Sequence, residues 1–380
     1  MNDGGFGCYV HLPFCDRICP YCDFAVARMD RTLAVRYLRA LENEIRRSSH
    51  RGALHTIFLG GGTPSALGAA AIEQILGSLF ETFAVEPDAI ECTLEANPSR
   101  NAGDLPALRA AGVNRLSIGV QSLDDGELHR LGRDHSAADA LRYVDAAREA
   151  GFENISLDLI AGAPGQTAGS FAHTLHGAIG KDVEHVSVYG LTIEAGTPYA
   201  TWHAREPAAF PDDDAVAELL SLARRTLVDA GYRHYELSNF ARPGRECAHN
   251  IGYWCQRDCL AFGMSAAGFL DGERTRNARD LDGYCAAIEA GRSPVDRAER
   301  LDRQARIGEA AMLALRTSDG IDDEDFRRRF RIDTKVAFAV PRRECASTGL
   351  LEVDDTGVRL TERGKLLAND VCARFLDPAL

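Results

Sequence analysis

Short apolar runs rich in β-branched residues alternate with longer segments of helical periodicity through the first two thirds of the chain. The runs predict strands and the periodic segments predict helices. The clearest helices are expected over residues 33–47 and 137–150, the second ended by Gly151. The expected strands cover residues 8–13, 56–59, 90–95, 115–120, 155–160, 185–191 and 232–237.

The repeated order of strand, turn and helix predicts an α/β fold with a parallel sheet. Six or seven such units favour a partial (β/α) TIM-like barrel, in which functional side chains lie at the carboxyl ends of the strands. We expect the barrel to cover residues 1–240, a connecting segment 241–296, and a C-terminal domain 297–380.

The C-terminal domain is predicted to be mostly helical and winged-helix-like. Helices are expected over residues 301–315 and 321–330, followed by a hairpin around Asp354 to Gly357 and a final helix from Thr361. Arginines are frequent between residues 327 and 343, but acidic residues precede them at 322–325. This mixture favours an ion-paired surface over a DNA-binding one.

Composition narrows the choice of partner and compartment. The 380 residues are 45% hydrophobic and 26% charged, as in ordinary globular proteins, and 43 basic against 56 acidic residues give a net charge of −13. This charge argues against nucleic acid or an anionic membrane as the main partner. No apolar run approaches the roughly 20 residues of a membrane span, and the N-terminus is unlike a signal peptide, so a cytoplasmic protein is expected.

Three of the 11 cysteines form a tight group, Cys15-x3-Cys19-x2-Cys22, directly after the first expected strand. In a reducing compartment such a group is explained by metal or by burial rather than by disulfides. Three thiolates on one loop can hold three corners of an iron–sulfur cube and leave one iron open, because Phe24 stands where a fourth local ligand could be. A zinc site, with His11 as the one nearby candidate for a fourth ligand, and plain burial are the alternatives.

Polar residues follow the next strands. A glycine-rich loop, Gly60 to Ser65, permits close backbone approach to a ligand. An ordinary strand-to-helix turn that binds no ligand could have the same sequence. Buried carboxylates need partners or a cavity, and an internal salt bridge or cap would also satisfy them. The polar candidates beyond this loop are Glu95, Gln121, Asp158 and Arg133, the last of which could simply pair with Asp134.

The cysteine spacing resembles that of the radical SAM superfamily. Residues 9–15, 60–65, 95–98, 117–122, 131–133, 158–160 and 164–166 also resemble the family of oxygen-independent coproporphyrinogen III oxidase. The resemblance implies a 4Fe–4S cluster on Cys15, Cys19 and Cys22, S-adenosylmethionine (SAM) as a second cofactor, and an external electron donor. It also implies SAM contacts by Tyr9, Tyr21, Gly61, Gly62, Thr63, Glu95, Gln121, Arg133 and Asp158.

Two departures point within this family to its heme chaperone branch, HemW. The oxidase pattern has a further cysteine where this chain has Phe24, and an N-terminal arm for which Cys15 lies too near the start. Coproporphyrinogen dehydrogenation is therefore not expected. The branch motif His-Asn-x-x-Tyr-Trp is matched by His249 to Trp254, which implies heme contact by His249, although a histidine beside asparagine is also typical of a hydrogen-bonded loop or cap.

A later segment departs from the family. Ala261, Met264 and Ala267 replace a glycine, a proline and a histidine of the usual pattern. The leading hypothesis is a protein that binds heme and delivers it to an acceptor protein, with membrane contact only through that acceptor. The alternative is a radical SAM enzyme, such as a methyltransferase or cyclopropanase, that acts on a small molecule through a 5′-deoxyadenosyl radical.

Overall fold

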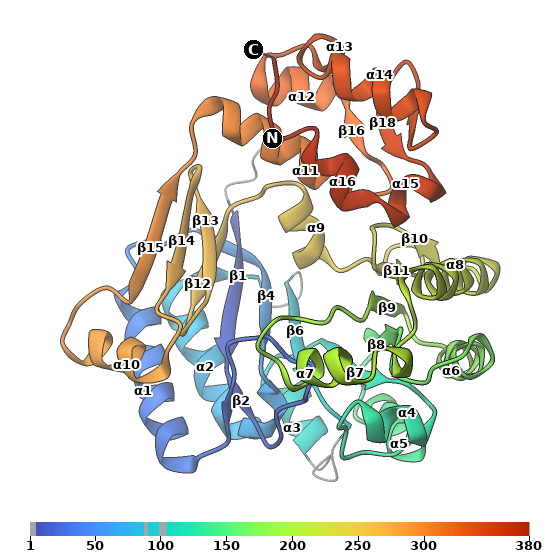
Figure 1. Ribbon diagram of the computed structural model, residues 1–380. Helices are drawn as coiled ribbons and strands as arrows, with labels where there is room; N and C mark the ends of the chain where they lie inside the picture. The colour runs from blue at the N-terminus through green and yellow to red at the C-terminus, as the bar shows by residue number, and fades with distance from the viewer. Residues whose placement is uncertain (1–4, 87–89, 99–103, 380) are drawn as a thin grey trace.

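The computed structural model describes residues 5–86, 90–98 and 104–379. In its central sheet the first six predicted strands run parallel in the order β9-β8-β7-β6-β4-β1 (Figure 1). These strands are β1 (Gly5–Leu12), β4 (Ala53–Gly61), β6 (Glu91–Ala96), β7 (Arg115–Gln121), β8 (Ile155–Ala161) and β9 (His185–Gly190). The prediction of a partial (β/α) barrel is confirmed.

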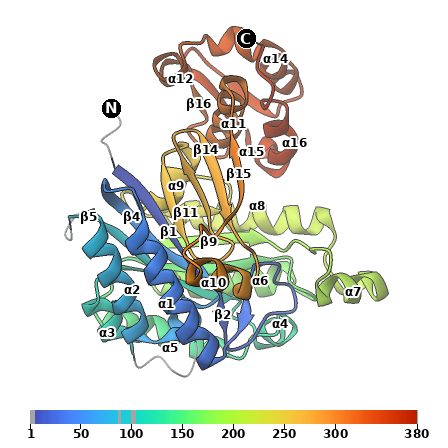
Figure 2. The same cartoon turned by 90° about the vertical axis from the view of Figure 1, so that its left-hand side faces the viewer.

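Helices follow these strands and most of them cover the outer face of the sheet, whereas α7 projects away from it beside the cysteine loop (Figures 1 and 2). They are α1 (Arg31–Arg47), α2 (Ala69–Thr82), α3 (Leu105–Ala110), α4 (Asp125–Arg130), α5 (Ala137–Glu149), α6 (Ala168–Gly180), α7 (Pro198–Arg205) and α8 (Asp213–Asp229). Shorter elements between them are β2 (Phe14–Cys15), β3 (Ala27–Arg28), β5 (Ala84–Val85), η1 (Pro64–Leu67) and η3 (Pro207–Ala209). Helix α1 begins where the Asp30 side chain accepts hydrogen bonds from the backbone amides of Thr32 and Leu33.

The alternation of side chains along each strand sets the character of the barrel interior. In β7, Leu116, Ile118 and Val120 belong to the hydrophobic core, whereas Arg115 and Ser117 line the cavity inside the barrel. Successive residues of a strand point to opposite faces. The interior of this barrel is therefore unusually polar, and the apolar core lies between the sheet and its helices.

One edge of the sheet differs from the prediction. The seventh parallel strand expected over residues 232–237 is wrong in length and direction, because β10 (Arg233–His234) pairs antiparallel with β11 (Asn239–Ala241), which pairs antiparallel with β9. The chain leaves the sheet after His234. There, Leu237 donates a backbone hydrogen bond to Arg316, and Glu236 forms a bridge with Thr317 of the C-terminal part.

The opposite edge extends through a segment that the sequence did not identify as strands. Strand β12 (Cys259–Phe262) pairs parallel with β1, and β13 (Ala267–Leu270), β14 (Glu273–Asn277) and β15 (Val295–Arg300) follow antiparallel. Helices α9 (Ala248–Trp254) and α10 (Leu281–Glu289) belong to this part of the chain. Tyr284, Cys285 and Ile288 of α10 are part of the barrel's hydrophobic core.

The C-terminal elements form a second hydrophobic core, which contains Phe326, Phe338 and Phe375. Figures 1 and 2 show these elements grouped at one end of the barrel, on the side where α9 lies. The helices are α11 (Arg303–Leu315), α12 (Asp323–Phe330), α13 (Thr334–Ala337), α14 (Ala339–Ser347), α15 (Glu362–Leu366) and α16 (Ala368–Ala373). A small sheet joins β16 (Ile321–Asp322), β18 (Gly357–Leu360) and β17 (Leu351–Val353), so the expected hairpin is present and the expected helix 321–330 begins two residues later.

Ion pairs hold several of the arginines noted in this part of the sequence. Arg328 and Arg329 pair with Asp325, and Arg342 makes a buried pair with Asp323. Within the described residues no helix is long and apolar enough to cross a membrane.

Candidate functional site

A cavity of about 580 Å³ lies inside the barrel and reaches from the cysteine loop to helix α9. The two ends of the cavity correspond to the two ends of the strands, with the cysteine loop after β1 and α9 beside the first residues of β4 and β6. Most of the predicted site residues line this single cavity. They are Cys15, Cys19, Tyr21, Cys22, Gly61, Gly62, Thr63, Glu95, Gln121, Arg133 and Asp158.

The three cysteines lie on a loop that is tied to the barrel. The backbone amide of Cys22 donates to the carbonyl of Cys19 at 3.1 Å. The Thr63 hydroxyl donates to the sulfur of Cys15, and the Arg133 guanidinium donates to the sulfur of Cys19, each at 3.5 Å. Burial raises the pKa of Cys15 to about 11 and also raises the pKa of Cys22. Without a metal these two sulfurs are therefore protonated thiols at neutral pH.

This arrangement fits an iron–sulfur cluster. In the part of the chain that the structure describes, no three His, Cys, Asp or Glu side chains are arranged to hold a single metal ion. A cluster makes a different demand, because each thiolate binds its own iron. Hydrogen bonds to the sulfurs, as from Thr63 and Arg133, are the outer contacts that orient such ligands and tune the metal.

The glycine loop after β4 packs closely against the cysteine loop. The amides of Gly61, Gly62 and Thr63 donate to Glu95, to the Leu12 carbonyl and to the Phe14 carbonyl, each at 2.9 Å. A Cβ atom on Gly62 would lie 2.6 Å from the Pro13 backbone. The glycines are needed for this approach, and because the three amides are already bonded, a ligand would meet other atoms of the loop.

Two carboxylates face the cavity, Glu95 from β6 and Asp158 from β8. Burial raises the pKa of Glu95 to about 7, against the lowering effect of the Gly61 amide. Burial likewise raises the pKa of Asp158, which accepts hydrogen bonds from Ser117 at 2.9 Å and Ser156 at 3.3 Å. Arg115 acts electrostatically on Asp158, but no ion pair within the described residues holds either carboxylate, and buried carboxylates without an ion pair are costly. This pair therefore suits a positively charged ligand, and SAM carries a sulfonium and an ammonium group.

Arg133 is held at the cluster end of the cavity rather than in a pair with Asp134. Its guanidinium donates to the Asn97 side chain and to the Gly119 carbonyl, in addition to Cys19. Its Nε atom is buried and lacks a partner within the described residues. This atom leaves Arg133 a donor for a ligand carboxylate, and Asn97 fixes its orientation.

The structure places two predicted residues outside the cavity lining. The Tyr9 hydroxyl bonds to His11 Nδ1 at 2.9 Å. The His249 ring bonds to the Thr56 hydroxyl at 2.8 Å and to the Tyr253 hydroxyl at 3.0 Å, and it stacks on Phe58. The roles of Tyr9 in SAM contact and of His249 in heme contact stay predictions.

Several cavity residues were missed in the sequence. Arg115, Ser117 and Asn97 line the cavity, as do His185 from β9 and Asn250 from α9. The signal for Arg115 and Ser117 was present, because both alternate with apolar residues in the expected strand 115–120. Asn250 could have been found as the neighbour of His249 in the branch motif.

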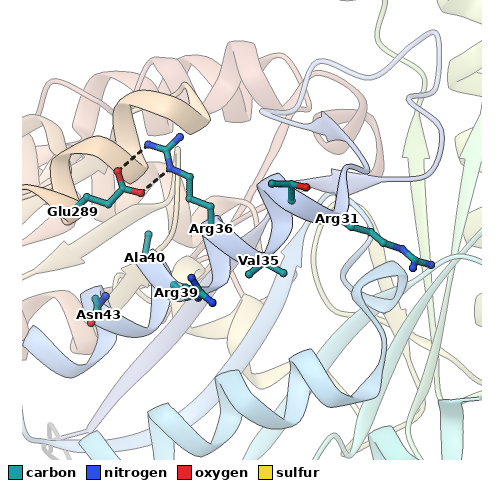
Figure 3. A pocket seen from close by; sticks show the side chains of 8 residues that line it. Arg31, Val35, Arg36, Arg39, Ala40, Asn43 and Glu289 are labelled. Atoms are coloured by element: carbon teal, nitrogen blue, oxygen red, sulfur yellow. Dashed lines mark hydrogen bonds and ion pairs between the residues drawn. The ribbon is translucent and has the colours of Figure 1, made fainter.

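A second hollow lies on the outer surface, away from this cavity. It has a volume of about 740 Å³ and is lined by residues of α1 together with Glu289, as Figure 3 shows. Arg36 spans it through a 2.7 Å ion pair with Glu289. No predicted site residue lines this outer hollow, so the barrel cavity is the candidate site.

Comparisons with known proteins agree with the geometry. The radical SAM superfamily model matches residues 9–177, and the HemN C-terminal domain model matches residues 301–367. The heme chaperone HemW of Bacillus subtilis is 35% identical over 97% of this chain and 98% of its own. That of Mycobacterium tuberculosis strain H37Rv is 35% identical over 98% and 95%.

A mitochondrial relative and a solved structure extend the comparison. The mitochondrial radical S-adenosyl methionine domain-containing protein 1 of Bos taurus is 34% identical over 97% of this chain and 86% of its own. The structure of coproporphyrinogen III oxidase (HemN) from Escherichia coli, described as a radical SAM enzyme, superposes with a TM-score of 0.87 at 26% identity. It covers 99% of this chain and 91% of that one.

The raised pKa of Glu95 predicts a pH dependence of stability in the ligand-free protein. The folded state holds this proton more tightly than the unfolded state, whose ordinary value is 4.5. The contribution of Glu95 to the free energy of unfolding is therefore complete below about pH 4.5 and is lost as the pH rises through about 7. We expect Glu95→Gln to reduce the decline of stability between pH 5 and 8 by on the order of 1–2 kcal/mol, measured by urea unfolding. Glu218→Gln, at an exposed position outside the cavity lining, is the control, and equal slopes in wild type and Glu95→Gln would contradict the prediction.

Proposed function

The chain belongs to the HemW heme chaperone family of radical SAM proteins, and from this membership we propose that it binds heme and delivers it to an acceptor protein. The observation that carries the proposal is the cavity that joins the cysteine loop to α9. Helix α9 bears the branch motif His249 to Trp254, and its Asn250 lines the same cavity. This continuity of the cavity supports a site in which the cofactors that family membership implies, a 4Fe–4S cluster and SAM, would lie beside the segment that we propose for heme.

We propose Cys15, Cys19 and Cys22 as the cluster ligands. A cluster held by three protein thiolates supplies an iron with an open coordination position. Around that position this chain offers Arg133 for a carboxylate and Glu95 and Asp158 for cationic or hydroxyl groups. These side chains would orient SAM, and Tyr21, Gly61, Gly62, Thr63 and Gln121 would complete the enclosure, with Tyr9 behind them.

His249 is the proposed heme ligand. Burial lowers its pKa to about 3, so the imidazole is neutral at physiological pH, which is the form that binds iron. Its Nδ1 atom is held by Thr56, and its Nε2 atom faces Tyr253 of the same helix. Ligation would exchange the hydrogen bond to Tyr253 for a bond to iron, while Thr56 keeps the ring oriented.

The cluster assignment predicts a loss of iron on substitution. Cys19→Ser removes one thiolate of the loop. After anaerobic reconstitution, its iron content should therefore be well below that of a complete 4Fe–4S cluster, which is about four irons per chain. Cys255→Ser is the matched control, because Cys255 is also partly exposed but lies outside the cavity. Iron and sulfide analysis with the visible spectrum measures the result. Full iron in Cys19→Ser, or zinc in wild type after reconstitution, would contradict the assignment.

The heme proposal predicts one heme per chain in an anaerobic titration followed by absorbance. His249→Ala should weaken binding by about tenfold or more and change the heme spectrum, since an axial ligand is lost. His234→Ala is the control, because His234 is a half-buried imidazole whose pKa is also lowered, it stacks on Phe240, and it lies outside the cavity lining. Absence of a stoichiometric absorbance change in wild type would remove the proposed function. An unchanged spectrum in His249→Ala would place the ligand elsewhere.

A further inference from the structure

The inner end of the barrel cavity contains a buried arginine. Arg115 is the first residue of β7, is 2% exposed, and lines the cavity together with Ser117 and Gln121 of the same strand. Alternation along β7 makes these residues face the barrel interior. Arg115 and Gln121 lie at opposite ends of β7, and Gln121 is at the end near the cysteine loop.

The surrounding protein does not satisfy every hydrogen-bond donor of the Arg115 guanidinium. Its Nε atom is buried and has no hydrogen-bond partner in the described part of the chain. Directly across the sheet, its register partner Thr93 is fully buried, and the Thr93 hydroxyl also lacks a partner there. Two unpartnered polar groups on adjacent strands at one level of a barrel are unusual, because buried polar groups are normally bonded.

The nearest carboxylates are engaged elsewhere. Glu91 and Asp158 act electrostatically on Arg115. Glu91 accepts hydrogen bonds from the backbone amides of Ala248 and His249 at the start of α9, at 2.9 and 3.0 Å. Asp158 accepts from the serine hydroxyls on β7 and β8. The fold therefore uses these acids to hold α9 and the sheet.

The partner that suits this place is a carboxylate. A guanidinium offers a planar set of N–H donors that matches the two oxygens of a carboxylate, and a hydroxyl adds a further donor. Asn250 faces the same cavity from α9 and can contribute an amide N–H. His249, the proposed heme ligand, is its neighbour in sequence and is close enough to Arg115 for the guanidinium to help lower its pKa.

We propose that Arg115 and Asn250, which line the cavity, form a binding subsite for a carboxylate of the molecule that occupies it, with Thr93 beside Arg115 on β6. Two sources have this chemistry, a propionate of heme and the methionine carboxylate of SAM. The heme source rests on the proposed function and would place a propionate near Arg115 when His249 binds iron. The SAM source would require SAM to extend from the cluster end of the cavity, where Arg133 lies, to Arg115 at the inner end.

Wild-type protein distinguishes the sources without any substitution. Hemin and hemin dimethyl ester share the ring and the iron, but the ester lacks the two negative charges. If a propionate occupies the subsite, anaerobic titrations should give roughly ten- to hundredfold weaker binding of the ester, the usual effect of losing a charge-assisted hydrogen bond. Failure of wild type to bind hemin would instead remove the proposed function. The subsite would then be tested by the affinity for SAM alone.

Substitution then assigns the effect to Arg115. Arg115→Gln should weaken hemin binding roughly ten- to hundredfold and leave the ester nearly unchanged if the source is heme, or should weaken SAM binding by that factor if the source is SAM. Arg148→Gln is the control for a lost guanidinium, because Arg148 pairs with Glu184 on the outside of the barrel. Cluster content and thermal unfolding report whether each variant is folded.

Thr93→Val keeps the inference testable if Arg115→Gln does not fold. Valine has nearly the shape of threonine and removes only the hydroxyl, so affinity for the same ligand should fall several-fold. Unchanged affinities for both hemin and SAM in folded Arg115→Gln would overturn the inference. If that variant does not fold, unchanged affinities in Thr93→Val together with equal binding of hemin and its ester would overturn it.

Discussion

Buried charge inside an incomplete barrel is the constraint on which the rest of this structure depends. The strand alternation that sends leucine, isoleucine and valine to the helices sends Glu95, Asp158 and Arg115 into the barrel, where burial disfavours their charged forms. Serine hydroxyls and backbone amides satisfy these groups only in part. The apolar core outside this polar interior stabilises the fold, and the groups of the interior that stay unsatisfied suit a ligand of mixed charge.

The two ends of the barrel are joined by hydrogen bonds as well as by the cavity. Asp158 and His185 both bond to the Ser156 hydroxyl, and the other nitrogen of His185 bonds to the Tyr235 hydroxyl at 2.9 Å. Tyr235 in turn accepts from the amide of Cys247, which caps α9. The carboxylate proposed for SAM is thus connected, through one chain of side chains, to the helix proposed for heme.

Much of this arrangement could be predicted from the sequence, for physical reasons that apply to particular segments. Six parallel strands were readable because each is a short β-branched run followed by a helix, and the cysteine loop was readable from its spacing. The strand expected over residues 232–237 failed because the chain turns to pair with Arg316 and Thr317, a long-range contact without a local signal. The hairpin of β13 and β14 did carry a signal. Asp271 and Gly272 have φ of +48° and +78°, as a two-residue hairpin turn requires.

The central claim is that three thiolates hold a cluster whose fourth iron is open to SAM. Electron paramagnetic resonance of the anaerobically reconstituted, reduced protein, recorded with and without SAM, tests it most directly. The account predicts the signal of a reduced 4Fe–4S cluster whose g values change when SAM is added, because a new ligand enters at one iron. A cluster signal that is identical in the two samples, or the absence of any cluster signal, would contradict it.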